Sequence, residues 1–363
     1  MTKRVYSYTF QTEMCMHTNR GMNVPVTIKE IAELANVSRG TVDRALHGRG
    51  GVRPDVEKRI CTIAESMGYR PNSAARALSK LRNNLVIGLL LPSIDNPFFD
   101  DLIAGARSAQ REFSDHGVKL IEEHMQGYNV SEQISRIDAL KKRGINALAL
   151  LPFDDSQIIE KINELDASGI DVITVNSDIF GSRRSTYVGV DFEKSGRMAA
   201  GVVGLINPRA KVLIVLGSPK LLSHNLRIQG FFDVIQSRFP GVEVCAKVVC
   251  HDDHFLAYDV TRRSLYDKPE IDMIYIVGEG ITGVCAAVKE FKNRQIDIVC
   301  FDDVPHTKRL IAEGRISATI CQQPFQQGYN AVQQCYYHFL GINSGDSDKV
   351  LMDNIVKIRE SLE

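Results

Sequence analysis

Residues 26–46 read VTIKEIAELANVSRGTVDRAL, and this stretch decides the fold of the front of the chain. Thr27 and Glu30 have the spacing of a capping box, in which a hydroxyl and a carboxylate satisfy free backbone N–H groups where a helix begins. Apolar residues then recur with the spacing of one helix face: Ile28, Ile31, Ala32 and Ala35. This pattern predicts a helix that begins after Thr27 and buries that face.

Two further short helices are expected directly after it. Asn36 and Val37 interrupt the first pattern, and Ser38 offers an N-cap for a second helix. The inward positions of this second helix are Val42, Ala45 and Leu46. A third stripe, which Gly68 is expected to end, consists of Val52, Val56, Ile60, Ile63, Ala64 and Met67. Three short helices around one small core predict a helix-turn-helix module whose second helix can enter a DNA groove.

The distribution of charge favours a polyanionic partner for this front part. The formal charge of the 363 residues is zero, but residues 1–84 hold 14 Lys and Arg against 7 Asp and Glu. The front therefore carries +7 and the remainder −7. Lys and Arg gain affinity for nucleic acid by displacing counterions from phosphates. A basic face that is merely solvated would have the same charge. The sequence motifs are therefore needed to distinguish a DNA-binding surface from a solvated one.

The run from Val26 to Ser79 resembles the DNA-binding headpiece of the lactose-repressor/galactose-repressor family. It shares the family's V-T opening, its A-x-V-S-x-x-T-V segment and its closing G-Y-x-P-N-x-x-A-x-x-L. The resemblance implies that Arg39, Gly40 and Arg44 occupy base-reading positions. It also implies phosphate contacts from Thr27, Ser38, Thr41 and Asn72. The guanidinium of Arg44 can bond guanine O6 and N7 together, although a contact with phosphate alone stays open.

The same resemblance implies a hinge helix within residues 72–81, NSAARALSKL, which forms when two chains meet on DNA. Leu78 matches an apolar wedge in the minor groove, and Ala75 matches a small contact that permits close approach. The alternative is an ordinary amphipathic linker, because a helix of this length is marginal alone. The expected organisation is a disordered tail (1–24), a headpiece (25–70), a hinge and linker (71–84) and a sensor domain (85–363).

Short apolar segments alternate with helical stretches throughout the sensor region. Ten strands are expected at 85–91, 118–123, 146–151, 171–175, 185–190, 211–216, 242–249, 272–277, 297–301 and 316–320. This alternation predicts an α/β fold of parallel sheets, and ten strands favour two lobes with a ligand cleft between strand ends. The expected lobes are 85–190 with 323–342, and 191–322 with 343–363.

This half resembles the periplasmic sugar-binding proteins of the ribose-binding type (type I), and the resemblance implies a sugar or polyol effector. Residues that match the ligand positions of that type follow different strands: Asn96, Phe98, Phe99, Asn176, Arg227, Glu279, Asp302 and Gln322. Amides paired with aromatic faces suit a hydroxylated ring, which needs directional polar groups and an apolar cover. At least one of the two phenylalanines is also expected in the core.

Two departures from the ribose-type pattern bear on the ligand. Asn176–Ser177 stands where that pattern has Asp-Arg, and Gly278–Glu279 replaces its usual Asn. Loss of an Arg fork and gain of a carboxylate favour a neutral polyol over an anion, although Arg183 and Arg184 could restore a positive site.

Other motifs are interpreted as incidental. Gly278–Gly283 fits G-x-G-x-x-G, but it comes too late in the domain for a dinucleotide fingerprint. The segment 251–254, HDDH, is expected to be a solvated loop or a helix start, without metal. No catalytic set stands out, so neither turnover nor a cofactor is expected. No signal peptide and no membrane span are expected, because the opening of the sequence is polar and no apolar stretch has the length of a span. The eight cysteines include no Cys-x-x-Cys pair.

The sequence therefore predicts a cytoplasmic transcription repressor that binds operator DNA as a homodimer, with a tetramer left open. The alternative is a solute-binding or carbohydrate-binding protein without a role in transcription, and no membrane partner is expected.

Overall fold

The computed structural model describes residues 26–46, 50–67, 69, 84–94, 96–342 and 347–362. The chain forms two compact units, residues 1–72 and 73–363, and each is described by itself. The expected tail, the hinge with Asn72, Ala75 and Leu78, and the expected cap Gly68 lie outside the described residues.

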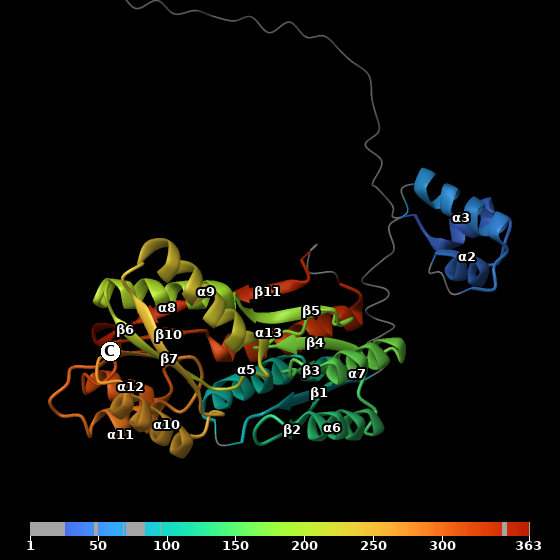
Figure 1. Cartoon of the computed structure of the whole chain (residues 1–363). Coiled ribbons are helices and arrows are strands. Elements are labelled where there is room, and N and C mark those ends of the chain that lie inside the picture. Colours follow the sequence, from blue (N-terminus) through green and yellow to red (C-terminus); the bar gives the residue numbers. More distant parts are fainter. Residues whose placement is uncertain are drawn as a thin grey trace, which may run out of the picture. The chain divides into compact units, whose positions relative to one another are not determined.

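The first unit contains the three helices that the sequence predicts (Figure 1): α1 (Ile28–Leu34), α2 (Arg39–Leu46) and α3 (Pro54–Ser66). The capping box is confirmed, because the Thr27 N–H donates to Glu30 Oε2 at 2.7 Å and the Glu30 N–H donates to Thr27 Oγ1 at 3.4 Å. Asn36 turns the chain with φ 51°, and the Thr41 N–H donates to Ser38 Oγ at 3.1 Å. The buried core of this unit is Ile31, Ala32, Ala35, Val42, Ala45, Val56, Ile60 and Ala64.

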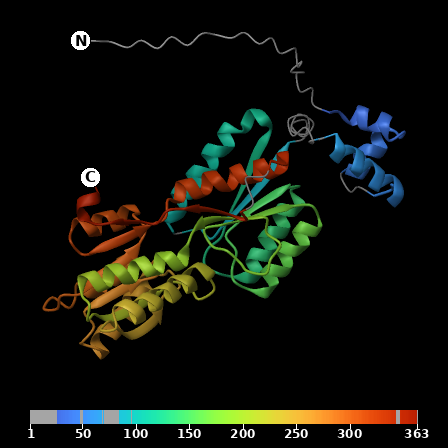
Figure 2. The same ribbon diagram turned by 90° about the horizontal axis from the view of Figure 1, so that it is seen from above.

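The second unit consists of two six-stranded sheets, one in each lobe (Figure 2). The first sheet has the order β11-β5-β4-β3-β1-β2. Its strands are β1 (Leu85–Leu91), β2 (Val118–His124), β3 (Ala147–Leu150), β4 (Asp171–Val175), β5 (Thr186–Val190) and β11 (Lys349–Met352). The second sheet has the order β12-β10-β9-β8-β6-β7. Its strands are β6 (Lys211–Leu216), β7 (Glu243–Val249), β8 (Met273–Ile276), β9 (Asp297–Phe301), β10 (Ala318–Cys321) and β12 (Ile355–Lys357).

Helices cover both faces of each sheet. The first lobe has α5 (Phe98–Glu112) and α13 (Pro324–Leu340) packed together, with α6 (Val130–Lys142) and α7 (Ser156–Ala167). In the second lobe α8 (Phe192–Ile206) packs on α9 (Leu222–Arg238), and α10 (His254–Asp267) packs on α11 (Ile281–Val288), with α12 (Pro305–Ala312) beside α11. The side chains of β8 show the two faces, because Tyr275 joins the apolar cluster under α8 and α9 while Ile274 joins the one under α10 and α11.

All ten expected strands are present, but the end of the chain differs from the expectation. The sequence places residues 343–363 in the second lobe, whereas β11 pairs parallel with β5 in the first sheet. The end of this segment matches the expectation, because β12 pairs antiparallel with β10 and Leu362 packs against a core cluster of the second lobe. The physical reason is that α13 lies in the first lobe, so the chain adds a strand to that sheet before it crosses.

Paired glycines let the principal helices approach closely. A Cβ on Gly328 of α13 would meet the Leu102 backbone oxygen, and one on Gly105 of α5 would meet that of Phe325. The second lobe repeats this arrangement, since Gly230 of α9 faces the Glu193 backbone oxygen of α8. These contacts set the position of α9, which carries part of the cleft.

Candidate ligand-binding cleft and DNA-binding helix

Two predicted ligand residues occupy equivalent places in the two lobes. Asn176 follows β4 with φ 63°, and Asp302 follows β9 with φ 65°. Their backbone N–H groups donate to the Val188 oxygen at 2.9 Å and to the Ile320 oxygen at 3.0 Å, which extends each sheet by one bond. A left-handed backbone is costly for residues other than glycine and is concentrated at functional sites. Both side chains stand at the carboxyl ends of parallel strands, where ligands bind in such folds.

Gln322 connects these two residues across the lobes. The Asn176 amide donates to Gln322 Oε1 at 3.1 Å, and the Gln322 amide donates to the two Asp302 oxygens at 3.1 and 2.9 Å. Gln327, which the sequence did not suggest, accepts from the Asn176 amide at 3.2 Å and donates to the Gln322 backbone oxygen at 2.6 Å. The result is a buried line of amide and carboxylate groups that can exchange partners with the hydroxyls of a ligand.

Arg227 brings a buried cation to this line from α9. Its guanidinium lies 3.5 Å from the centre of the Phe301 ring and 4.9 Å from that of Phe192. Among the described residues, its Nε and Nη2 atoms have no hydrogen-bond partner, nor has the hydroxyl of Tyr275. Buried donors without partners are costly, so these groups favour a polar ligand beside them.

Burial shifts the protonation of the charged pair. It raises the pKa of Asp302 to about 7, against the opposing attraction of Arg227. Burial also lowers the pKa of Arg227, although Asp302 opposes this shift. Burial is the largest cause of both shifts in the inner cleft, the region around Asn176, Gln322, Asp302 and Arg227, because removing a charged group from water is costly.

A second polar cluster surrounds the predicted residue Glu279. Its carboxylate accepts from His306 Nε2 at 3.2 Å, and its backbone N–H donates to Asp252 Oδ1 at 2.8 Å. His224 stands beside Asp252, and burial lowers its pKa to about 4. The sequence does not indicate Asp252, His224 and His306 as site residues. The neighbours of each follow other strands and are distant along the chain.

The HDDH segment is expected to be a solvated loop or a helix start, and its residues differ in this respect. The helix start is confirmed, since Asp253 caps α10 by accepting from the Leu256 N–H at 2.7 Å. Asp252, in contrast, is no solvated loop residue, because it accepts hydrogen bonds from Glu279 and from Tyr128 of the first lobe. No group of three His, Cys, Asp or Glu side chains suited to a metal ion occurs in the part of the chain that the structure describes.

The remaining predicted residues lie either in the hydrophobic core or at a cavity between the lobes, which we call the mouth of the cleft. Asn96 lines a cavity of about 500 Å³ together with Tyr128 and Asp252, and its Oδ1 accepts from the Phe98 N–H at 3.1 Å. Phe98 and Phe99 both belong to the hydrophobic core of the first lobe, with ring centres 5.2 Å apart in an edge-to-face contact. The core role expected of at least one ring is confirmed, and a contact of either with the ligand stays a prediction.

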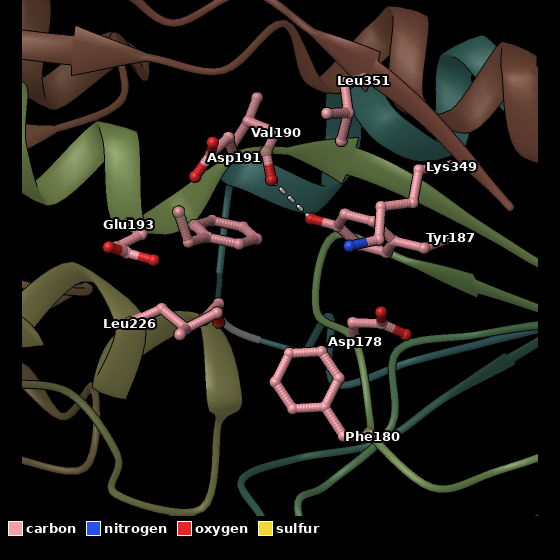
Figure 3. Close-up of a pocket in the computed structure, with 11 residues that line it drawn as sticks. Asp178, Phe180, Tyr187, Val190, Asp191, Glu193, Leu226, Lys349 and Leu351 are labelled. Carbon is pink, nitrogen blue, oxygen red and sulfur yellow. Dashed lines mark hydrogen bonds between the residues drawn. The ribbon is translucent and has the colours of Figure 1, made fainter. Parts of the chain in front are cut away.

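Arg183 and Arg184 are held by partners away from these clusters. Arg184 pairs with Asp178 at 2.7 Å and with Asp348 at 2.9 Å, and Arg183 lies 3.7 Å from Asp166. Asp178 lines a separate cavity of about 220 Å³, which residues of both lobes enclose (Figure 3). None of the predicted ligand residues lines that cavity.

In the first unit, α2 exposes the face expected to read DNA. Val42 and Ala45 are buried, while Arg39, Gly40 and Arg44 are exposed and Thr41 is partly exposed. Ser38 and Thr41 share a hydrogen bond of 2.9 Å between their hydroxyls, at the start of the helix. The structure thus brings these residues together on one surface, as a helix entering a groove requires. Thr27 is exposed at the start of α1, where its side chain serves the capping box.

In comparisons with known proteins, each of the two units matches a family whose description fits its structure. Residues 27–72 match the family described as bacterial regulatory proteins, lacI family, and residues 87–342 match the periplasmic binding protein domain. Among the described residues, no helix has the length and apolar character that crossing a membrane requires.

Individual relatives and a solved structure support the same family assignment and fold. The chain is 32% identical to a ribose operon repressor of Lactococcus lactis over 317 residues, which cover 85% of this chain and 90% of the repressor. It is 26% identical to the ribose import binding protein RbsB of Bacillus subtilis, over 73% of this chain and 83% of that one. The glucose-galactose binding protein GanP of Geobacillus stearothermophilus has the same fold, with TM-score 0.72 and 24% identity over 77% of this chain and 99% of that one. The chain therefore belongs to the lacI family of bacterial regulatory proteins and is a DNA-binding transcriptional regulator with a sensor domain of the periplasmic binding protein type.

Proposed function

We propose that this chain is a cytoplasmic repressor that binds a near-palindromic operator as a homodimer and releases or tightens its hold when a neutral monosaccharide occupies the cleft. The observation that carries the proposal is the buried line Asn176–Gln322–Asp302, which joins the two lobes beside the unpartnered nitrogen atoms of Arg227. Such a line couples lobe closure to the hydroxyls of a ligand. One headpiece reads few base pairs, so a two-fold dimer supplies the remaining contacts.

The charge of the cleft supports a neutral effector. Two carboxylates, those of Asp252 and Glu279, lie in or beside the inner cleft, and a third, that of Asp302, is about half ionised near pH 7 because its pKa is raised to about 7. Among the described residues, the single buried guanidinium of Arg227 opposes them. Arg183 and Arg184, which could have supplied positive charge, pair with carboxylates elsewhere. A phosphate or carboxylate group would meet like charge that little water screens. Because two of the relatives are named for ribose, D-ribose is the first neutral sugar to test.

A thermal-shift comparison of D-ribose and D-ribose 5-phosphate tests this proposal. A neutral effector at about 100 times its dissociation constant adds about 2.7 kcal/mol to native stability, whereas the phosphate should add nothing. Arg227→Gln should abolish the shift because it removes the buried cation from the cleft. Stabilisation by the phosphate alone would contradict the proposed charge preference.

Arg44→Ala separates the two functions of the chain. It should weaken specific operator binding by about 1–3 kcal/mol, because a base contact is lost. The ligand-induced thermal shift should stay as in the wild type, since Arg44 lies in the other compact unit. Unchanged operator affinity in a fluorescence anisotropy titration would show that Arg44 reads no base.

A further inference from the structure

One hydrogen bond crosses the mouth of the cleft between the two lobes. Tyr128 lies between β2 and α6 of the first lobe, and its hydroxyl donates to Asp252 Oδ2. Asp252 lies between β7 and α10 of the second lobe. Both residues line the 500 Å³ cavity at the mouth. Asp252 also lies beside the buried imidazole of His224. Tyr128 and Asp252 therefore stand between the mouth and the inner cleft.

The backbone conformation of Asp252, two neighbouring glycines and a hydrogen bond hold its carboxylate in place. His251 and Asp252 have φ 53° and 59°, two consecutive left-handed residues that are not glycine. Such a backbone conformation is costly for residues other than glycine and persists where its surroundings enforce it. A Cβ on Gly217 or on Gly278 would meet the Asp252 carboxylate and the His224 ring, so the two glycines form the slot that this carboxylate occupies. Its second oxygen accepts from the Glu279 N–H at 2.8 Å.

Tyr128 is fixed from the other side. Its ring packs edge-to-face on Phe153, with ring centres 5.6 Å apart. Its backbone oxygen accepts from Lys220 Nζ of the second lobe at 3.2 Å. Burial and the nearby Asp252 carboxylate raise the pKa of Tyr128 well above its usual range, which keeps the hydroxyl a hydrogen-bond donor. The hydroxyl and both carboxylate oxygens therefore have protein partners without any ligand.

We propose that Tyr128 and Asp252 form a latch that holds the two lobes closed, and that the latch raises effector affinity by populating the closed form. This inference rests on the proposed function only in assuming that the effector binds in the cleft. The bond can exist only while the lobes are together, so it stabilises the closed form whether or not ligand is present. Apparent affinity scales with the fraction of molecules in the binding-competent form. Tyr128 and Asp252 are thus positioning residues that act through closure.

A backbone bond provides a readout of closure in the ligand-free full chain. The Asp154 N–H of the first lobe donates to the Lys220 oxygen of the second lobe at 2.8 Å. Opening of the lobes breaks this bond and exposes the amide to exchange. Hydrogen exchange measured by mass spectrometry on peptides that contain Asp154 therefore reports closure, and peptides of β1 report whether the fold is intact.

Tyr128→Phe removes the latch hydroxyl and keeps the ring on Phe153. Tyr258→Phe is a matched control, since Tyr258 donates to the Glu290 carboxylate within the second lobe. We expect the Asp154 amide to exchange about 10-fold faster in Tyr128→Phe, the effect of losing one bond to a charged group, and at the wild-type rate in Tyr258→Phe.

Titration with D-ribose should then show about 10-fold weaker binding for Tyr128→Phe and wild-type binding for Tyr258→Phe. Wild-type exchange at Asp154 in Tyr128→Phe, with β1 protected, would overturn the latch. Faster exchange with unchanged D-ribose affinity would overturn its effect on affinity. If D-ribose fails to bind the wild type, the effector proposal fails, while the exchange rates still decide the latch.

Discussion

Asp302 shows how a single residue of the cleft combines a structural cost with a proposed role in ligand binding. Its carboxylate is buried beside Arg227, and burial raises its pKa to about 7 from an ordinary value of 3.8. The protonated form is therefore favoured by folding. Stability from this preference is fully present below about pH 4 and is lost as the pH rises through 7. Asp303, the next residue, behaves in the opposite way. Burial would raise its pKa, but the hydrogen bond and charge of Lys357, together with the charge of Lys308, outweigh burial and lower the pKa.

Asp302→Asn should flatten the dependence of stability on pH. Between pH 5 and 7 the wild type should lose up to about 1.4 kcal/mol of unfolding free energy per pH unit relative to this variant. Asp303→Asn should leave that slope unchanged in this range, since the stabilisation by Asp303 is lost only at lower pH. Urea denaturation at several pH values measures both slopes. Parallel slopes for the wild type and Asp302→Asn would show that Asp302 does not titrate in this range.

The sequence could predict some residues of the candidate site and not others for a physical reason. Asn176, Asp302 and Gln322 follow apolar strands directly, and within each sheet the carboxyl ends of the parallel strands lie at the edge where ligands bind. Tyr128 and His224 lie in a loop and in a helix, and their roles depend on Asp252, which is distant in sequence. No local pattern encodes such a pairing, so these residues required the structure.

At the scale of elements, the α8–α9 contact connects packing to the proposed ligand-binding role of Arg227. Gly230 of α9 lies against the Glu193 backbone oxygen of α8, and Arg227 stands one turn earlier on the same helix. Helix periodicity alone could predict that α8 and α9 exist. It could not predict that β11 joins the first sheet, because β11 is a short strand whose partner, β5, is distant in sequence.

Gly230→Ala should push α9 away from α8 and displace Arg227. We expect a loss of about 1–3 kcal/mol of unfolding free energy, as overpacking usually costs, together with weaker effector binding. Gly201→Ala in α8 is the matched control, because nothing lies within 4 Å of the added Cβ. This control should gain about 0.5–1 kcal/mol from helix propensity. Equal urea midpoints for the two variants would show that the glycine contact is not required.

At the scale of the whole molecule, the proposed regulation requires the two compact units to communicate through the expected hinge and linker, residues 71–84. Closure of the two lobes requires the chain crossings between them to adjust together, including the one after β11. In a dimer, such closure would change the separation of the two first lobes and hence of the paired segments that lead to the headpieces. This coupling needs no contact between headpiece and effector.

Leu78→Ala tests whether the hinge segment transmits that change. Leu78 lies outside the described residues, and its expected role follows from its match to an apolar wedge in the minor groove. A short helix is unstable alone, so the segment should become ordered only with its twin and the DNA, and loss of the wedge should weaken specific operator binding and bending. Effector affinity in the free protein should stay as in the wild type. The measurement compares operator affinity with and without effector for both proteins. Wild-type operator affinity together with a wild-type effector response in Leu78→Ala would reduce residues 72–81 to a tether.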